Sequence, residues 1–95
     1  MSARVRMFST QWCSYCFAAR RLFETLGVPY EDTDVSRDPA LRADMEARSG
    51  RRTVPQIWIG DRHMGGFDDV NALHARGMLM PLLTGGEPSA PASGE

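Results

Sequence analysis

VRMFSTQWCSYCFAARRLFETLG occupies residues 5–27 and combines a short strand, a break and an amphipathic helix. Val5–Ser9 is predicted as the strand, and the next three residues interrupt it as a loop. From Cys13 onward a helix is predicted, because apolar residues recur on one face at i, i+3, i+7 and i+10: Cys16, Ala19, Phe23 and Leu26. Gly27 can accept the positive φ of a helix C-cap, and Pro29 prevents the helix from continuing. Both cysteines therefore lie at the mouth of a helix.

A C-x-x-C pair at a helix start has a specific chemical meaning. The first cysteine, Cys13, lies beside unpaired backbone N–H groups and the positive end of the helix dipole, which favour a thiolate. The thiolate is the attacking species in thiol–disulfide exchange. Cys16 follows one turn later, close enough to bond Cys13 and expected to be buried beneath it. We therefore predict that Cys13 is the nucleophile and Cys16 the resolving thiol.

Two other roles for the cysteines fit the sequence less well. A structural zinc site needs four ligands, and the remaining candidates, His63 and His74, lack the spacing of a zinc-finger pair. A purely structural disulfide between Cys13 and Cys16 would close a very short loop, which contributes least to stability in the chain-entropy model. The order of strand, C-x-x-C and helix favours redox chemistry.

The rest of the chain alternates strands and helices. A second strand is predicted over 29–35, followed by a helix that begins at Asp38-Pro39 and ends at Gly50. Residues 56–59 and 62–64 are predicted as a hairpin around Gly60-Asp61. A further helix, with Asp68 or Asp69 as its N-cap, is expected to end near Gly77, and residues 78–83 can add a short final helix.

This order predicts an α/β fold with a four-stranded mixed sheet flanked by helices. We expect one domain over residues 1–83. Residues 84–95 lack an apolar anchor and are expected to form a disordered C-terminal tail.

Composition narrows the possible partners. The formal net charge of −1 favours neither a nucleic acid nor a membrane partner. No apolar stretch has the length of a membrane span or the pattern of a signal peptide, so a cytoplasmic location is expected. Gly65-Gly66 does not form a dinucleotide-binding motif, so a nicotinamide cofactor is not expected.

Three blocks in order resemble the dithiol glutaredoxins of the thioredoxin-like fold, and the stretches 49–56 and 73–83 also resemble the bacterial glutaredoxin 3 group. The blocks are Cys13-Ser14-Tyr15-Cys16, Thr53-Val54-Pro55 and Gly65-Gly66-Phe67-Asp68-Asp69. The resemblance covers about residues 4–83. It implies a glutathione-dependent disulfide oxidoreductase, with glutathione as co-substrate.

The resemblance also implies where glutathione binds. In the family, the proline matching Pro55 is cis, and the backbone matching Val54 pairs with the cysteine portion of glutathione. The implied glutathione-binding residues are Tyr15, Arg52, Thr53, Val54, Pro55, Gly66, Phe67, Asp68 and Asp69. Thr10 stands where many members have lysine, and Arg52 or Arg42 are candidate replacements for that charge.

We expect reduction of glutathione mixed disulfides and of protein disulfides, by a chain that is monomeric by default. Because Ser14 replaces the usual motif proline, an alternative is a dimer that binds a [2Fe–2S] cluster through Cys13 and bound glutathione of each subunit. No other metal site is expected. A third possibility is an electron donor fed by thioredoxin reductase instead of glutathione.

Overall fold

The computed structural model describes residues 4–84, and these form a four-stranded sheet with four helices. The strands are β1 (Val5–Ser9), β2 (Glu31–Asp34), β3 (Gln56–Ile59) and β4 (Arg62–Gly65). The helices are α1 (Ser14–Thr25), α2 (Pro39–Ser49), α3 (Phe67–Ala75) and α4 (Leu79–Leu83). Each predicted element is present. The second strand is shorter than the predicted range 29–35: it begins at Glu31 and ends at Asp34, so that Pro29, Tyr30 and Val35 lie outside it.

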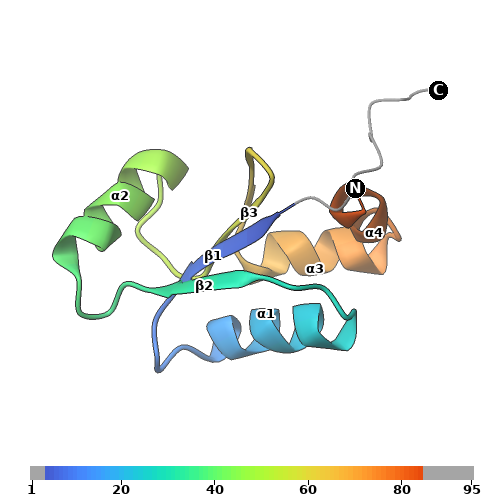
Figure 1. The fold of residues 1–95 in the computed structure, drawn as a ribbon, viewed down its shortest axis with the longest axis horizontal. Helices are drawn as coiled ribbons and strands as arrows, with labels where there is room; N and C mark the ends of the chain where they lie inside the picture. Colours follow the sequence, from blue (N-terminus) through green and yellow to red (C-terminus); the bar gives the residue numbers. More distant parts are fainter. Residues whose placement is uncertain (1–3, 85–95) are drawn as a thin grey trace.

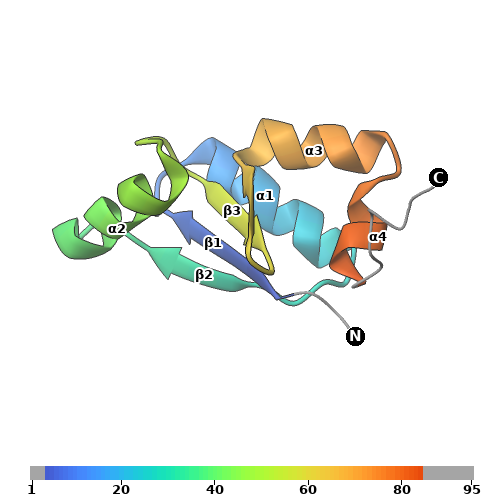
Figure 2. The same cartoon turned by 90° about the horizontal axis from the view of Figure 1, so that it is seen from above.

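The sheet order is β2-β1-β3-β4. β1 pairs with β2 in parallel, and both the β1–β3 and β3–β4 pairs are antiparallel. α1 and α3 lie on the same side of this sheet, whereas α2 is set apart from them at one end of the molecule (Figures 1 and 2). The mixed sheet and flanking helices expected from the order of elements are therefore confirmed.

Burial follows the alternation of the strands and the apolar face of α1. In β1, Val5, Met7 and Ser9 are buried and the residues between them are half-buried. The core that these strands share with the helices also contains the following residues: Ala19, Phe23, Ile57, Ile59, Val70, Leu79 and Leu83. Packing of α1 and α3 onto the central strands holds the C-terminal end of β1, and with it the cysteine loop, in place.

Local signals account for most helix ends. Asp38 caps α2 by accepting hydrogen bonds from the backbone N–H groups of Ala40 and Leu41, and Gly50 ends the helix with a φ of 70°. The N-cap predicted for α3 was wrong: the cap is Gly66, and Asp69 at the third helical position accepts the Gly66 N–H at 2.9 Å. α3 starts two residues earlier than a cap at Asp68 requires and three earlier than a cap at Asp69 requires, because its first turn follows directly from β4.

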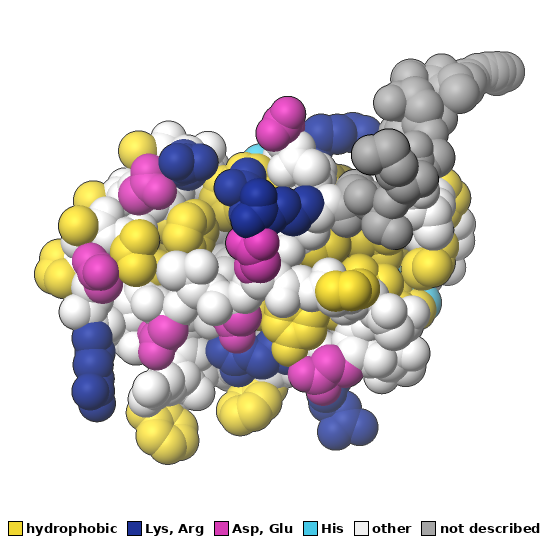
Figure 3. All heavy atoms as spheres, viewed as in Figure 1, with side chains coloured by type: hydrophobic (Ala, Val, Ile, Leu, Met, Phe, Trp, Pro, Cys, Tyr) yellow, Lys and Arg dark blue, Asp and Glu magenta, His cyan; other side chains and the backbone are white. Residues whose placement is uncertain are grey.

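Charges of both signs are interspersed with apolar side chains on the face shown in Figure 3. None of the helices within residues 4–84 is long and apolar enough to span a bilayer. The tail predicted for residues 84–95 lies outside the described residues, except for Thr84, which caps the end of α4.

Candidate active site

Cys13 is the N-cap of α1, in the position that the sequence predicted. Its backbone is extended, with φ −122° and ψ 115°, and its Sγ accepts a hydrogen bond from the Cys16 backbone N–H at 3.2 Å. Cys13 is half-buried, so that its sulfur is within reach of a ligand. An amide donor and the positive end of the α1 dipole both stabilise negative charge on this sulfur.

Cys16 is completely buried one turn into the same helix. Burial, and then its hydrogen bond with Cys13, raise the pKa of the Cys16 thiol to about 12. Cys16 therefore remains a neutral thiol at neutral pH while Cys13 is reduced. The asymmetric exposure that the C-x-x-C spacing predicted is present.

The difference in exposure between Cys13 and Cys16, together with the protonated state of Cys16, predicts selective alkylation of the reduced protein. At pH 7–9, iodoacetamide is expected to modify Cys13 and leave Cys16 unmodified, because the thiolate is the reacting species and Cys16 is both buried and protonated. Peptide mass spectrometry after a short exposure measures the two sites separately. Unfolding in urea should expose Cys16 and abolish the selectivity, and equal labelling in the native protein would contradict the assignment.

A loop that ends in a cis peptide bond between Val54 and Pro55 faces the Cys13 sulfur. Cys13 Sγ lies 3.6 Å from the Val54 carbonyl oxygen, so the thiol can donate to it. Buried Gln56 holds this loop: its amide nitrogen donates to the Thr53 carbonyl oxygen at 2.9 Å. The Gln56 amide oxygen lies 2.7 Å from His63 Nε2.

His63 completes the support of this loop from edge strand β4. Burial and the positive charge of Arg51 lower the pKa of His63, which leaves its ring neutral at pH 7. A neutral ring can donate its Nε2–H to Gln56. The role of His63 is thus structural, whereas exposed His74 on α3 lies away from this network.

A cavity of ≈270 Å³ brings together most of the residues that the resemblance implied for glutathione binding. Those lining it are Tyr15, Thr53, Val54, Pro55, Gly66, Phe67, Asp68 and Asp69. The rings of Tyr15 and Phe67 face each other at 6.4 Å between centroids. Arg52 does not line the cavity; its carbonyl oxygen accepts a hydrogen bond from the Arg42 guanidinium at 3.0 Å.

Arg51 lines the same cavity and was missed by the sequence analysis. Its guanidinium lies 3.3 Å from the Asp69 carboxylate, 18 residues away in the chain. The Gly66 N–H, and then Arg51, lower the pKa of Asp69, so this carboxylate is ionised at neutral pH. Asp68 is exposed beside it. No local sequence pattern predicts that Arg51 pairs with Asp69. The two adjacent arginines, 51 and 52, were the available indication of a basic group at this place.

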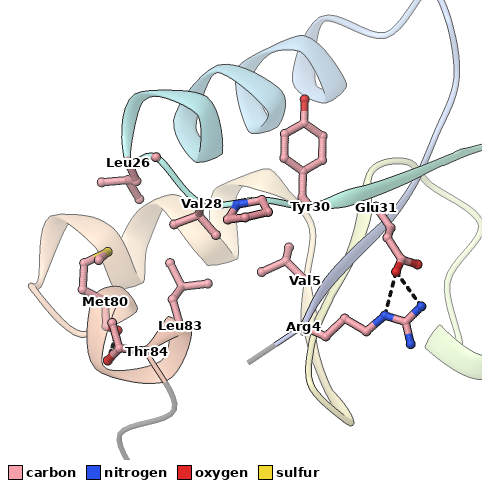
Figure 4. A pocket seen from close by; sticks show the side chains of 11 residues that line it. Arg4, Val5, Leu26, Val28, Tyr30, Glu31, Met80, Leu83 and Thr84 are labelled. Atoms are coloured by element: carbon pink, nitrogen blue, oxygen red, sulfur yellow. Dashed lines mark hydrogen bonds and ion pairs between the residues drawn. The ribbon is translucent and has the colours of Figure 1, made fainter. Parts of the chain in front are cut away.

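A larger cavity of ≈450 Å³ lies at the opposite end of β1 from the cysteines (Figure 4). Leu26, Val28, Met80 and Leu83 line it, and an ion pair between Arg4 and Glu31 borders it. Its lining is mainly apolar and contains neither cysteine. It therefore belongs to the packing around α4 and not to the chemistry at Cys13.

The fold, a half-buried cysteine at a helix start and a buried cysteine one turn later together define a thiol–disulfide oxidoreductase of the thioredoxin-like class. The glutaredoxin family model matches residues 5–64. The chain belongs to the glutaredoxin family, whose members are glutathione-dependent disulfide oxidoreductases.

Individual relatives agree with this assignment. Glutaredoxin 3 of Escherichia coli K12 is 44% identical over 81 residues, covering 85% of this chain and 98% of that protein. A glutaredoxin of Pseudomonas aeruginosa is 42% identical over 80 residues, covering 84% and 95%. The crystal structure of a buckwheat glutaredoxin–glutathione complex superposes with a TM-score of 0.81 at 35% identity, covering 87% of this chain and 78% of that one.

Proposed function

We propose that this protein reduces glutathione mixed disulfides and protein disulfides, with Cys13 as nucleophile and Cys16 as resolving thiol. The observation that carries the proposal is the position of the Cys13 sulfur. It lies 3.6 Å from the carbonyl oxygen of Val54, a residue that lines the cavity together with Phe67 and Asp68. The similar buckwheat glutaredoxin, solved as a complex with glutathione, supports glutathione as the ligand of this cavity.

Glutathione has groups that match the cavity along its length. The backbone N–H and C=O of Val54 can pair with the cysteine portion of glutathione in the manner of an added strand. The N-terminus of α3, which begins at Phe67, can receive the γ-glutamyl carboxylate, and the exposed Asp68 carboxylate can pair with the ammonium. In this binding mode we expect the glutathione sulfur to point towards Cys13.

The reaction begins when the Cys13 thiolate attacks the glutathione-side sulfur of a mixed disulfide. A bond forms between Cys13 and glutathione, the substrate disulfide breaks, and the substrate leaves as a thiolate that takes a proton from water. In the monothiol branch, a second glutathione thiolate attacks the glutathione sulfur and releases reduced Cys13 with oxidised glutathione. In the dithiol branch, Cys16 attacks Cys13, forms the intramolecular disulfide and releases the bound thiol.

Replacing Cys16 with serine should separate the two branches. Cys16→Ser should retain reduction of a small glutathione mixed disulfide to within about threefold, because that branch needs Cys13 alone. It should lose reduction of a protein disulfide by at least roughly 100-fold, because the trapped mixed disulfide is not resolved. Turnover coupled to glutathione reductase measures the first activity, and reduction of insulin measures the second. Equal loss of both would contradict the assignment of Cys16.

The alternative of cluster binding has support in the accessibility of Cys13 next to Ser14. No group of three potential metal ligands gathers within residues 4–84, so a [2Fe–2S] cluster would need a second chain and external thiols. A visible spectrum taken before the turnover assay tests this. Negligible turnover in a coloured dimer would favour the cluster, and negligible turnover in a colourless protein would favour a donor fed by thioredoxin reductase.

A further inference from the structure

Arg20 connects three separate parts of the chain close to the cysteines. It lies on α1, one turn after Cys16, and its Nε forms an ion pair with Asp32 of β2 at 2.7 Å. The same guanidinium donates to the Ser9 hydroxyl at 3.0 Å and to the Thr10 carbonyl oxygen at 3.4 Å. α1, β2 and the start of the cysteine loop are thereby connected through one side chain.

This network is more protected than a surface ion pair. The Arg20 and Asp32 side chains are only 20% and 27% exposed, and Ser9, whose hydroxyl donates to Asp32, is completely buried. Partly buried charges of this kind are screened less by solvent and salt than exposed ones. The guanidinium therefore has a defined position relative to the Ser9–Thr10 backbone and to the helix that carries Cys16.

The resolving step requires a negative charge on the Cys16 sulfur, and the reduced protein disfavours that charge. Cys16 must lose its proton before it can attack the Cys13–glutathione disulfide, and burial disfavours the thiolate. Contact with Cys13 opposes it as well in the reduced protein, but that opposition is removed once Cys13 is in a disulfide. The Thr10 backbone and the positive charge of Arg20 act in the opposite direction and offset a smaller part of this rise in the pKa of Cys16.

We propose that Arg20 is a positioning residue for the resolving step: held by Asp32 and Ser9, it fixes the Thr10 carbonyl at the start of the cysteine loop and places a positive charge one helical turn from Cys16, the attacking thiolate. In this step the Cys16 thiolate attacks Cys13 Sγ, the Cys13–Cys16 bond forms, and glutathione leaves as a thiolate. Many family members have a lysine at the position of Thr10. In this chain the Arg20 guanidinium provides a positive charge next to that loop. The proposal depends on the proposed role of Cys16 in the dithiol branch.

The expected effect is specific to one branch. Raising the pKa of Cys16 by one unit lowers its thiolate fraction tenfold, but the greater nucleophilicity of the more basic thiolate offsets part of this, which leaves about three- to fourfold in rate. Arg20→Met should therefore slow release of glutathione by Cys16 about three- to fourfold for each unit by which the pKa of Cys16 rises. Turnover of a small mixed disulfide in the monothiol branch does not use Cys16 and should be unchanged.

The experiment starts by mixing the reduced full-length protein with oxidised glutathione, which forms the Cys13–glutathione disulfide. Acid quenching and intact-mass measurement then follow the rate at which Cys16 expels glutathione across a range of pH. Arg20→Met should shift this pH profile to higher pH, Arg20→Lys should restore it, and Arg21→Met, an exposed neighbour on α1, should match wild type. Arg20→Gln, which retains hydrogen bonding to Ser9 without charge, serves as the neutral variant if Arg20→Met does not fold.

Outcomes separate this inference from the proposed function itself. Slow resolution with normal monothiol turnover in Arg20→Met, or in Arg20→Gln, would support the role of Arg20. An unshifted pH profile in the neutral variant, or equal loss in both branches, would overturn it while leaving the functions of Cys13 and Cys16 intact. Absence of any Cys13–glutathione adduct in Cys16→Ser, which cannot resolve it, would overturn the proposed function instead.

Discussion

Replacing Cys13 with serine is expected to abolish disulfide reduction in both branches. A serine hydroxyl does not form the thiolate that attacks a disulfide, and it cannot carry glutathione through a disulfide bond. Turnover should fall to the rate of uncatalysed thiol exchange, a loss on the order of 10³-fold or more. The glutathione reductase-coupled assay measures this loss directly.

The same substitution should leave the fold intact, which makes the result interpretable. Cys13 is the N-cap of α1, and serine is a favoured residue at that position because its Oγ can accept the Cys16 N–H. Thermal unfolding of Cys13→Ser should therefore resemble that of wild type, and Cys16→Ser provides the matched variant that keeps monothiol turnover. Residual monothiol activity above about a tenth of wild type would mean that Cys16 can replace Cys13 as nucleophile.

Replacing Gly65 with alanine should cause a large loss of stability, because two effects coincide there. Gly65 has a φ of 105°, which strains any residue with a Cβ, and that Cβ would lie 2.2 Å from Asp69 Oδ2. The displaced carboxylate is the one that accepts the Gly66 N–H and pairs with Arg51. Left-handed strain of about 1–2 kcal/mol and loss of a helix cap worth about 0.5–2 kcal/mol predict a decrease of about 1.5–4 kcal/mol in the free energy of unfolding.

Gly60→Ala is the matched control for this prediction. Gly60 also has a positive φ, 62°, but a Cβ there meets no atom within 4 Å. It should lose only the strain, about 1–2 kcal/mol, whereas Gly65→Ala should lower the melting temperature by roughly 10–20 °C and raise the KM for glutathione. Equal destabilisation in the two variants, measured by urea unfolding, would show that Asp69 moves aside without cost.

Much of the local structure was predictable because its causes lie within a few residues. Asp38 and Pro39 start α2 and Gly50 ends it by hydrogen bonds and backbone angles that act over about one turn. The placement of Cys13 and Cys16 on α1 follows from a spacing of three residues at a helix start. The candidate glutathione-binding residues came from a family resemblance, and the fold assembles eight of the nine around one cavity.

By itself, the sequence determined the order of the strands and helices along the chain, the roles expected of the two cysteines and the class of enzyme. Only the tertiary structure decided that Arg51 meets Asp69, that Arg20 meets Asp32, and that Gly66 and not an aspartate caps α3. The partners in these pairs are 18 and 12 residues apart, and the α3 cap depends on how β4 leads into that helix. Such contacts form only when the sheet and helices pack, because long-range packing and not local propensity determines which distant side chains become neighbours.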